Sequence, residues 1–168
     1  MSVYETVVTL PAFRGCATTD LQAFVAAAPP VRFKAASQLI RQGEAARGAF
    51  LVVHGHCRAE VQADGRSTVV GRAGPGDIVG ELGLFASGLT RSATVTAEDE
   101  VQALLLTQDL LADPAARTVL DLVELRALST LAERVRRSHA TRSRVQTLAP
   151  EPQAAPTLFT RLRRLLGA

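Results

Sequence analysis

The sequence predicts a mainly β protein with flanking helices, in which a small jelly roll is followed by a long C-terminal helix. Two observations lead to this fold class. Between about residues 31 and 107 the chain is a series of short apolar runs separated by turn residues, which is typical of a small β-sandwich or barrel. On either side of this region, apolar residues recur at helical spacing.

The first predicted helix lies near the N-terminus. Thr19-Asp20-Leu21-Gln22 has the form of a capping box, in which two side chains satisfy free amides at the start of a helix. The consecutive residues Pro29-Pro30 cannot continue a helix. We therefore expect a short helix that opens at the capping box and ends before the prolines.

The strands of the predicted jelly roll are short. In one of them Cys57, Ala59 and Val61 alternate with polar residues, and Asp64-Gly65 after it favours a tight hairpin turn. The predicted strands include the runs Phe50–Val53, Cys57–Val61, Thr68–Val70, Thr94–Thr96 and Gln102–Leu106.

Helical character returns after Thr107, breaks at Asp113-Pro114 and then extends over about residues 116–148. One face of this helix has apolar or small residues at intervals of three and four. Such a stripe favours packing against the same helix of a second subunit, as in a homodimer, or against the protein's own barrel. Its members are Leu128, Leu131, Val135, Ser138, Val145 and Ala149, with Arg142 as the polar exception.

Composition indicates one globular domain with a small appendage. The 168 residues are 47% hydrophobic and 21% charged, and the net charge of +3 is concentrated in the C-terminal third. Cys16 and Cys57 are too few for a disulfide framework, and we expect both to be small buried apolar residues. Without a recognisable signal peptide or an apolar stretch that could cross a bilayer, the chain is expected to be cytoplasmic.

The clearest chemistry lies in Gly80-Glu81-Leu82-Gly83-Leu84-Phe85, which is followed by Arg91-Ser92-Ala93. Free amides at the start of a helical turn can face an anion, and the two glycines permit close backbone approach. Arg91 can pair bidentately with two phosphate oxygens, and Ser92 can donate to a third. Because a phosphate would repel Glu81, we expect this carboxylate to accept hydrogen bonds from a ribose hydroxyl.

This order of residues resembles the phosphate-binding cassette of cyclic nucleotide-binding domains, especially those of the Crp/Fnr family. The similarity covers about residues 12–148. Its other landmarks are Leu39–Glu44, Gly55 and Gly74–Asp77. Thr90 departs from the pattern, since many relatives have proline there. Without proline, the backbone of the loop before the arginine is less restricted in conformation.

The resemblance implies a role for each candidate residue. Glu81 would hold the ribose 2′-hydroxyl, and Arg91 and Ser92 would hold the cyclic phosphate. Ala59, with Val70 and Ala73, would line the base, and the long helix would act as a lid that presents Ser138 or Thr141, depending on its register. The candidate ligand-binding residues are Gly80, Glu81, Leu82, Arg91, Ser92, Ala93, Val70, Ala73, Ser138 and Thr141.

A competing motif is similar to the first metal motif of cupins. It consists of His54-Gly55-His56 and Glu60, between Gly48 and Gly65. Two histidines two positions apart could hold a first-row metal with the glutamate. The third histidine that cupins usually supply is missing, since His139 lies in the predicted long helix. We therefore interpret the two histidines as residues that flank a turn, and we expect no metal and no catalytic site.

Nineteen residues follow Ala149, too few for the helix-turn-helix domain of the family's transcription regulators, so we expect no specific DNA binding. Residues 149–156 form a proline-rich linker, and residues 157–168 form a basic amphipathic tail. This tail could dock in a partner's groove, lie on an anionic membrane, fold back on its own domain, or attract nucleic acid without sequence preference.

Together these features predict a stand-alone sensor that binds a cyclic mononucleotide, cAMP by preference, and transmits binding to a partner through the C-terminal helices. cGMP is an alternative ligand. Alternative functions are a ligand-free interaction scaffold of the same fold, a cyclic di-GMP receptor and a cupin-like metalloenzyme. The intact Glu81, Arg91 and Ser92 argue against the scaffold, because unpaired buried charges are costly to retain.

Overall fold

The structure is a computed structural model that describes residues 2–85, 88–125, 128–129 and 132. The first of its two compact units is Met1–Ser129, and the description concerns this unit. Most of the predicted long helix, the linker 149–156 and the tail 157–168 lie outside the described residues. The predictions made for them, including the homodimer stripe and the lid, remain predictions.

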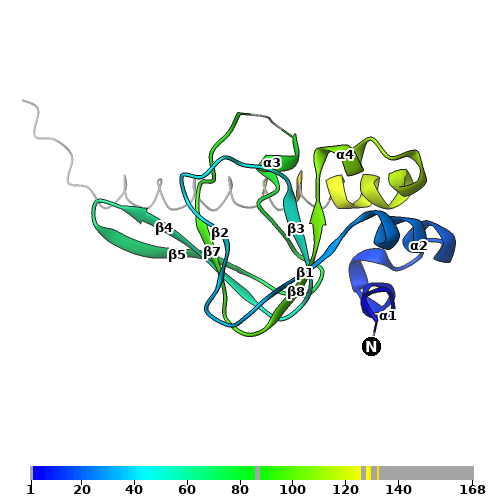
Figure 1. Ribbon diagram of the computed structural model, residues 1–168, viewed down its shortest axis with the longest axis horizontal. Helices are drawn as coiled ribbons and strands as arrows, with labels where there is room; N and C mark the ends of the chain where they lie inside the picture. The colour runs from blue at the N-terminus through cyan, green and yellow to red at the C-terminus, as the bar shows by residue number, and fades with distance from the viewer. Residues whose placement is uncertain (1, 86–87, 126–127, 130–131, 133–168) are drawn as a thin grey trace, which may run out of the picture. The chain divides into compact units, whose positions relative to one another are not determined.

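Two four-stranded antiparallel sheets form a β-sandwich (Figure 1). The first sheet has the order β1-β8-β3-β6, and its strands are Pro30–Phe33, Val101–Leu106, Ala49–His54 and Ile78–Val79. The second sheet has the order β2-β7-β4-β5, and its strands are Gln38–Ile40, Thr94–Ala97, Cys57–Ala63 and Arg66–Ala73. All strands that the sequence predicts are present, so the mainly β class with flanking helices is confirmed.

Strand β3 shows how alternation builds two cores. Leu51 and Val53 lie in a core on the outer side of the first sheet, whereas Val52 lies in the core between the sheets. Because successive side chains of a strand point to opposite faces, a strand that is covered on both sides is apolar throughout. Strand β8 follows the same rule, with Ala103 facing inward and Leu104 outward.

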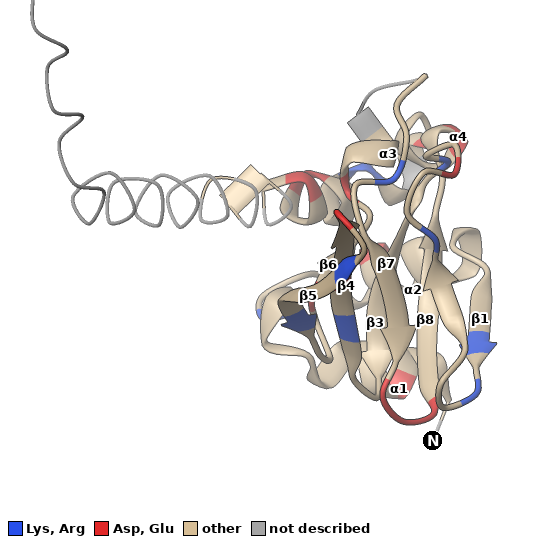
Figure 2. Cartoon of the chain, turned by 90° about the vertical axis from the view of Figure 1, so that its left-hand side faces the viewer, with Lys and Arg blue, Asp and Glu red and all other residues tan. Residues whose placement is uncertain are grey.

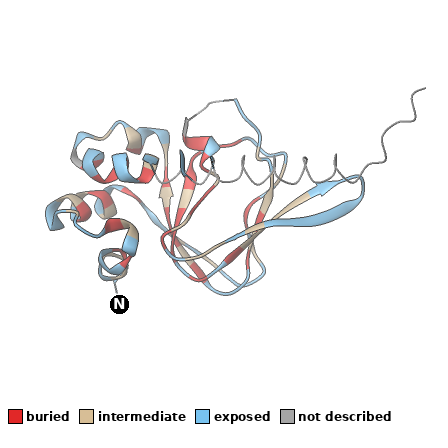
Figure 3. Cartoon of the chain, turned by 180° about the vertical axis from the view of Figure 1, so that it is seen from behind, coloured by how far each residue is buried: buried red, intermediate tan, exposed pale blue. Residues whose placement is uncertain are grey.

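Helices cover the outer face of the first sheet, and their buried residues lie toward it (Figure 3). They are α1 (Val3–Thr9), α2 (Thr18–Ala27), α4 (Gln108–Leu111), the 3-10 turns Pro11–Phe13 and Pro114–Ala116, and the helical residues 117–125. Phe24, Leu104 and Leu120 are fully buried in this layer. The apolar residues at helical spacing before and after the strands are therefore the ones that face this sheet. Within the described residues, no helix is long and apolar enough to span a bilayer.

Both N-terminal helices differ from expectation. Helix α1 was not predicted, although Ser2 and Glu5 form a complete capping box at its start. The capping box predicted at Thr19–Gln22 is wrong, because the N-cap of α2 is Ala17, two residues before Thr19, and it makes no side-chain cap bond. Thr19 is thus inside the first turn, where its hydroxyl donates to Asp20 at 3.4 Å. The predicted end of this helix before the prolines is confirmed.

Turn chemistry agrees with the sequence at two points. Asp64 and Gly65 have φ values of 51° and 73° in the β4–β5 turn, as a two-residue hairpin turn of the primed type requires. Thr107 caps α4 by accepting from the amide of Leu110 at 3.2 Å, and the helix ends before Pro114.

Strands β4 and β5 of the second sheet are largely exposed or partly buried in the described part of the chain. Basic residues occur on both strands (Figure 2).

Candidate functional site

The candidate site begins at the turn between β6 and α3, where α3 is the single helical turn Leu82–Phe85. Gly80 has a φ of +78°, which an L side chain rarely adopts. Its carbonyl accepts from the amide of Gly83 at 3.0 Å, and that of Glu81 accepts from Leu84 at 3.0 Å. Glu81 itself is only 1% exposed. The turn therefore places a carboxylate inside the protein, as an acid with a specific partner would require.

Arg91 reaches this turn from the segment that precedes β7. Its Nη1 donates to the carbonyl of Gly80 at 2.9 Å, and its Nη2 donates to the carbonyl of Arg47 at 3.1 Å. Burial lowers the pKa of the Arg91 guanidinium, whereas the negative charges of Glu81 and Glu44 raise it. The guanidinium is thus partly desolvated, held by two backbone carbonyls and attracted by two carboxylates.

The two glycines of the cassette make room for this arginine. A Cβ added to Gly80 would lie 2.6 Å from Nη1 of Arg91, and one added to Gly83 would lie 2.8 Å from the same atom. Gly83 is also confined by the carbonyl oxygen of Gly48, at 2.6 Å from such a Cβ. In this structure, therefore, the glycines admit the arginine and a neighbouring loop, whereas the sequence analysis assigned them to the approach of a ligand.

The neighbouring loop is segment 43–48, which we call the strap. It runs beside the residues that lead to Arg91 and pairs with them through an isolated antiparallel bridge between Ala45 and Thr90. Its backbone hydrogen bonds are Gly43 N to Arg91 O at 2.9 Å, Arg91 N to Glu44 O at 2.8 Å, Ala46 N to Leu89 O at 2.8 Å and Gly48 N to Gly83 O at 3.1 Å. The strap therefore joins the cassette turn to the arginine segment.

The remaining cassette residues lie toward the surface. Ser92 is exposed, Ala93 is partly buried and Leu82 is 40% exposed. Within the described part of the chain, no protein group accepts a hydrogen bond from the Leu82 amide. Ser92 and Leu82 are thus accessible from the surface, as a phosphate site would need.

The predicted base-lining residues lie on β4 and β5. Ala59 is paired with Gly71 and packs against the core between the sheets, as does Ala73. Val70 lies at the irregularity in the β4–β5 pairing and is 55% exposed. Ser138 and Thr141 are outside the described residues. The structure thus brings Gly80, Glu81 and Arg91 together, and the roles of the base-lining and lid residues remain predictions.

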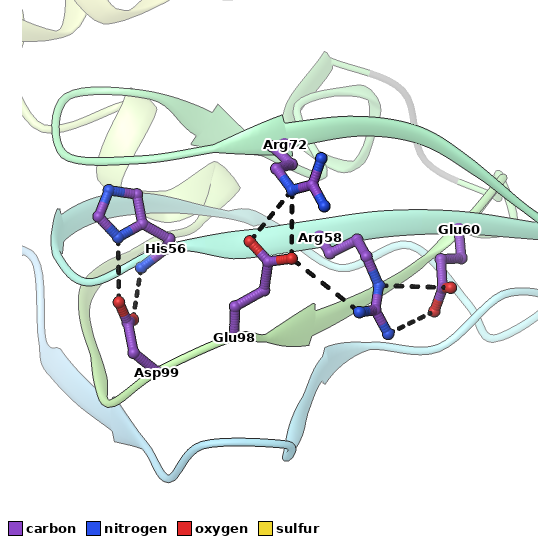
Figure 4. Close-up of polar contacts among 6 residues, drawn as sticks. All are labelled: His56, Arg58, Glu60, Arg72, Glu98 and Asp99. Atoms are coloured by element: carbon purple, nitrogen blue, oxygen red, sulfur yellow. Dashed lines mark hydrogen bonds and ion pairs between the residues drawn. The ribbon is translucent and has the colours of Figure 1, made fainter.

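The histidines of the competing motif flank a turn, as predicted. His54 ends β3 and Cys57 begins β4, and His56 is held by Asp99, which accepts from its amide at 2.6 Å and contacts Nδ1 at 3.0 Å (Figure 4). Glu60 instead pairs with Arg58, whose Nε lies 3.3 Å from Oε1. Among the described residues, no group of three or more His, Cys, Asp or Glu side chains could hold a metal ion.

A charged cluster is formed by Arg58 and Glu60 on β4, Arg72 on β5 and Glu98, which follows β7. Glu98 lies 3.2 Å from Nε of Arg72 and 4.0 Å from Nη1 of Arg58, so acids and bases alternate in this cluster (Figure 4). These side chains are 24% to 67% exposed, and such pairs typically contribute less than about 1 kcal/mol each. We assign the cluster a supporting role in the sheet.

The two cysteines are unpaired and differ in environment. Cys57 is fully buried, and burial, followed by the charges of Asp99 and Glu98, raises its pKa to about 11. Cys16 is partly buried beside the helical core, and burial followed by Asp20 raises its pKa as well. A raised pKa disfavours the reactive thiolate in both. The predicted burial is confirmed for Cys57 and not for Cys16, which is only partly buried.

Surface hollows give a further view of the site. One is lined by residues 62–67 at the β4–β5 turn and contains no cassette residue. Another is lined by residues 38–41 and Glu44, and it borders the cassette because Ile40 Cδ1 lies 2.7 Å from where a Cβ of Gly80 would be. Neither hollow is lined by Arg91.

The contribution of the strap was not predicted from the sequence. Arg47 supplies a carbonyl to Arg91, and the carboxylate of Glu44 acts on its charge. The run Leu39–Glu44 was noted only as a family landmark. A backbone acceptor has no signature of its own in a sequence, because every residue carries a carbonyl group.

Comparison with known proteins places this site in a family context. The model of the cyclic nucleotide-binding domain matches residues 30–117, more than half of the chain. The cAMP-activated global transcriptional regulator CRP of Salmonella typhimurium is 35% identical over 68 residues, which are 40% of this chain and 32% of that protein. The match thus spans about a third of this relative's length.

Solved structures agree on the fold. The catabolite activator protein of Thermus thermophilus aligns with a TM-score of 0.68 and 23% identity, over 82% of this chain and 63% of that one. A cAMP-binding acyltransferase from Mycobacterium smegmatis aligns with a TM-score of 0.58 and 27% identity, over 66% of this chain and 34% of that one.

Proposed function

Because the chain belongs to the cyclic nucleotide-binding domain family, we propose that it is a sensor of a cyclic mononucleotide, cAMP by preference. The observation that carries this proposal is the fully buried Glu81 next to the partly buried Arg91 in the cassette turn. A carboxylate and a guanidinium side by side match a ligand that has both a sugar hydroxyl and a phosphate. The names of the CRP and acyltransferase relatives, which include cAMP, support the choice of nucleotide.

Each group has a distinct role in this proposal. Arg91 and the hydroxyl of Ser92 bind the cyclic phosphate, with the amide of Leu82 as a further donor. Glu81 accepts from the ribose 2′-hydroxyl, and Ala73 contributes to the wall beside the base. These groups bind charge and hydroxyls but include no base placed to activate a water, so we propose binding without hydrolysis.

The C-terminal helices carry the signal in this proposal. The helix that starts at residue 117 packs on the sandwich through Val119, Leu120 and Val123, so it is attached to the ligand-binding domain. Ligand binding draws its continuation, with Ser138 or Thr141, toward the base and changes how the tail 157–168 meets a partner protein or an anionic membrane. A homodimer through this helix and the cytoplasmic location belong to the same proposal.

A ligand-free scaffold is the second candidate, and one observation favours it. Both terminal nitrogens of Arg91 already bond to backbone carbonyls, those of Gly80 and Arg47. The sequence-based argument that the arginine would be unpaired without a ligand is therefore wrong for this residue. Arg91 would stabilise the fold even in a protein that binds no nucleotide.

Calorimetry distinguishes the candidates. The purified protein is titrated with cAMP, cGMP and cyclic di-GMP, alongside the variants Arg91→Ala and Arg72→Ala. Arg72 is the matched control because it belongs to the charged cluster around Glu98. We expect cAMP to bind and Arg91→Ala, but not Arg72→Ala, to weaken binding at least about tenfold, as the loss of a charge-assisted bond implies.

Each other outcome has a definite meaning. If cyclic di-GMP or cGMP binds more tightly than cAMP, that nucleotide would be the proposed ligand instead of cAMP. Binding that persists in Arg91→Ala would contradict the assignment of the phosphate site. No binding by any of the three nucleotides would favour the scaffold. Chromatography of the nucleotide after incubation checks that it is recovered unchanged.

A further inference from the structure

The strap, segment 43–48, is attached to Arg91 through both its backbone and its side chain. The backbone bonds join Gly43 and Glu44 to the main chain of Arg91, and the side-chain bond joins the carbonyl of Arg47 to Nη2 at 3.1 Å. The carboxylate of Glu44 adds an electrostatic attraction, which raises the pKa of the guanidinium. Arg91 is therefore connected to the strap both through its main chain and through its guanidinium.

The guanidinium can bond an anion while it holds the strap. It has five N–H donors, and the carbonyls of Gly80 and Arg47 each accept one bond from it. The donors that remain lie on the same planar fork, so an anion that binds them also fixes the donors that hold the carbonyls. Anion binding and strap attachment are thus linked through a single rigid group.

The guanidinium of Arg91 and the strap pack around the same residue, Gly83. Nη1 of Arg91 lies 2.8 Å from where a Cβ of Gly83 would be, and the carbonyl oxygen of Gly48 and the carbonyl carbon of Ala46 lie 2.6 and 3.3 Å from that point. Three groups thus surround one glycine, with no room for a methyl group. The guanidinium and the strap therefore both pack closely against this glycine.

We propose that the strap reports occupancy of the cassette: a ligand phosphate on Arg91 stabilises the strap against local opening. This inference rests on the proposed function, since it takes a cyclic nucleotide as the anion. The ligand selects the state in which the guanidinium faces both the phosphate and the carbonyl of Arg47. It stabilises that state by as much as it prefers it to the open one.

The first test needs no ligand. Hydrogen exchange is measured at the amides of Gly43, Ala46 and Gly48 in the wild-type protein and in Arg91→Lys, whose single ammonium cannot reproduce the planar fork. We expect exchange about fivefold faster in the variant, corresponding to one lost hydrogen bond. Arg72→Lys, the same change in the charged cluster, is the matched control and leaves the rates unchanged.

An amide outside the strap shows whether the variant is folded. Val52 donates to Asp77 at 2.9 Å in the sandwich and keeps its protection if the fold is intact. With Val52 protected, wild-type exchange rates in the strap of Arg91→Lys would overturn the inference, whatever the protein binds. If Val52 also loses protection, the comparison is made instead on the wild-type protein with and without nucleotide.

The second test adds cAMP at a saturating concentration established by calorimetry. We expect exchange of the strap amides to slow at least about tenfold in the wild-type protein, while Val52 is unchanged. Calorimetric binding without slower exchange in the strap would overturn the inference and leave the proposed function intact. If cAMP, cGMP and cyclic di-GMP all fail to bind, the proposed function fails and the inference fails with it.

Discussion

A Cβ atom on Gly83 would lie 2.8 Å from Nη1 of Arg91, so these two residues exclude any larger side chain at the glycine. The arginine occupies the space that the missing side chain leaves. In that space it bonds to the carbonyls of Gly80 and Arg47, and the buried Glu81 attracts it. The glycine-rich turn therefore also accommodates the positively charged guanidinium of Arg91.

Gly83→Ala is expected to destabilise the protein by about 1 to 3 kcal/mol, because the methyl group forces Arg91 or the strap to move. Gly71→Ala is the matched control. Gly71 has nothing within 4 Å of an added Cβ, and we expect its change to stay within about 1 kcal/mol. Urea denaturation followed by circular dichroism measures both. Equal stabilities of the two variants would contradict the close packing around Gly83.

Glu81→Gln is expected to weaken cAMP binding by about ten- to a hundredfold, because the ribose hydroxyl loses a charged acceptor. The substitution preserves the size of this buried side chain, so the effect is separated from a cavity. Glu60→Gln, in the charged cluster with Arg58, is the control. Calorimetry measures the dissociation constants, and an unchanged value for Glu81→Gln would remove Glu81 from the site.

Alkaline pH should destabilise the protein through Cys57. Its pKa is about 11 in the folded state against an ordinary value of 9.0, so between these values the unfolded thiol loses its proton while the folded one keeps it. The folded state then binds more protons, and the free energy of unfolding falls by about 1.4 kcal/mol per pH unit.

Cys57→Ala should lack this contribution. Unfolding free energies of the wild type, Cys57→Ala and the control Cys16→Ala are compared between pH 8 and 11. Cys16 is present in both the wild type and Cys57→Ala, so the difference in slope between these two proteins reports Cys57, and Cys16→Ala reports the separate effect of the other thiol. Parallel curves for the wild type and Cys57→Ala would show that the thiol ionises as easily in the folded state.

Acidic pH should remove the contribution of Asp99 to the stability of the folded protein. The hydrogen bonds from the ring and then the amide of His56 hold the pKa of Asp99 below its ordinary value of 3.8. The ionised carboxylate is the stabilising form, so its contribution is present above about pH 4 and is lost as the pH falls through the lowered pKa.

Asp99→Asn is therefore expected to lower the melting temperature at pH 7 and to converge with the wild type in strong acid. Thermal unfolding between pH 2.5 and 7 measures the difference. Asp64→Asn is the control, since asparagine is also compatible with the φ of 51° at this turn position. A difference that stays constant with pH would mean that the two His56 bonds do not depend on the charge of Asp99.

The secondary structure was largely predictable because local patterns carry it. Alternation at Cys57, Ala59 and Val61 marked β4, and Asp64-Gly65 marked its hairpin turn. The start of α2 was misplaced because its N-cap, Ala17, makes no side-chain cap bond and so leaves no capping signal in the sequence. Helix α1 was missed although its capping box is present in the sequence.

The sequence by itself determined the family, the strand region and the candidate pair Glu81 and Arg91, because these depend on the order of residue types along the chain. Only the tertiary structure decided how Arg91 is held. Its acceptors are the carbonyls of Gly80 and Arg47, which lie 11 and 44 positions away in the chain. Carbonyl groups are identical in every residue, so folding alone selects which of them meet the arginine.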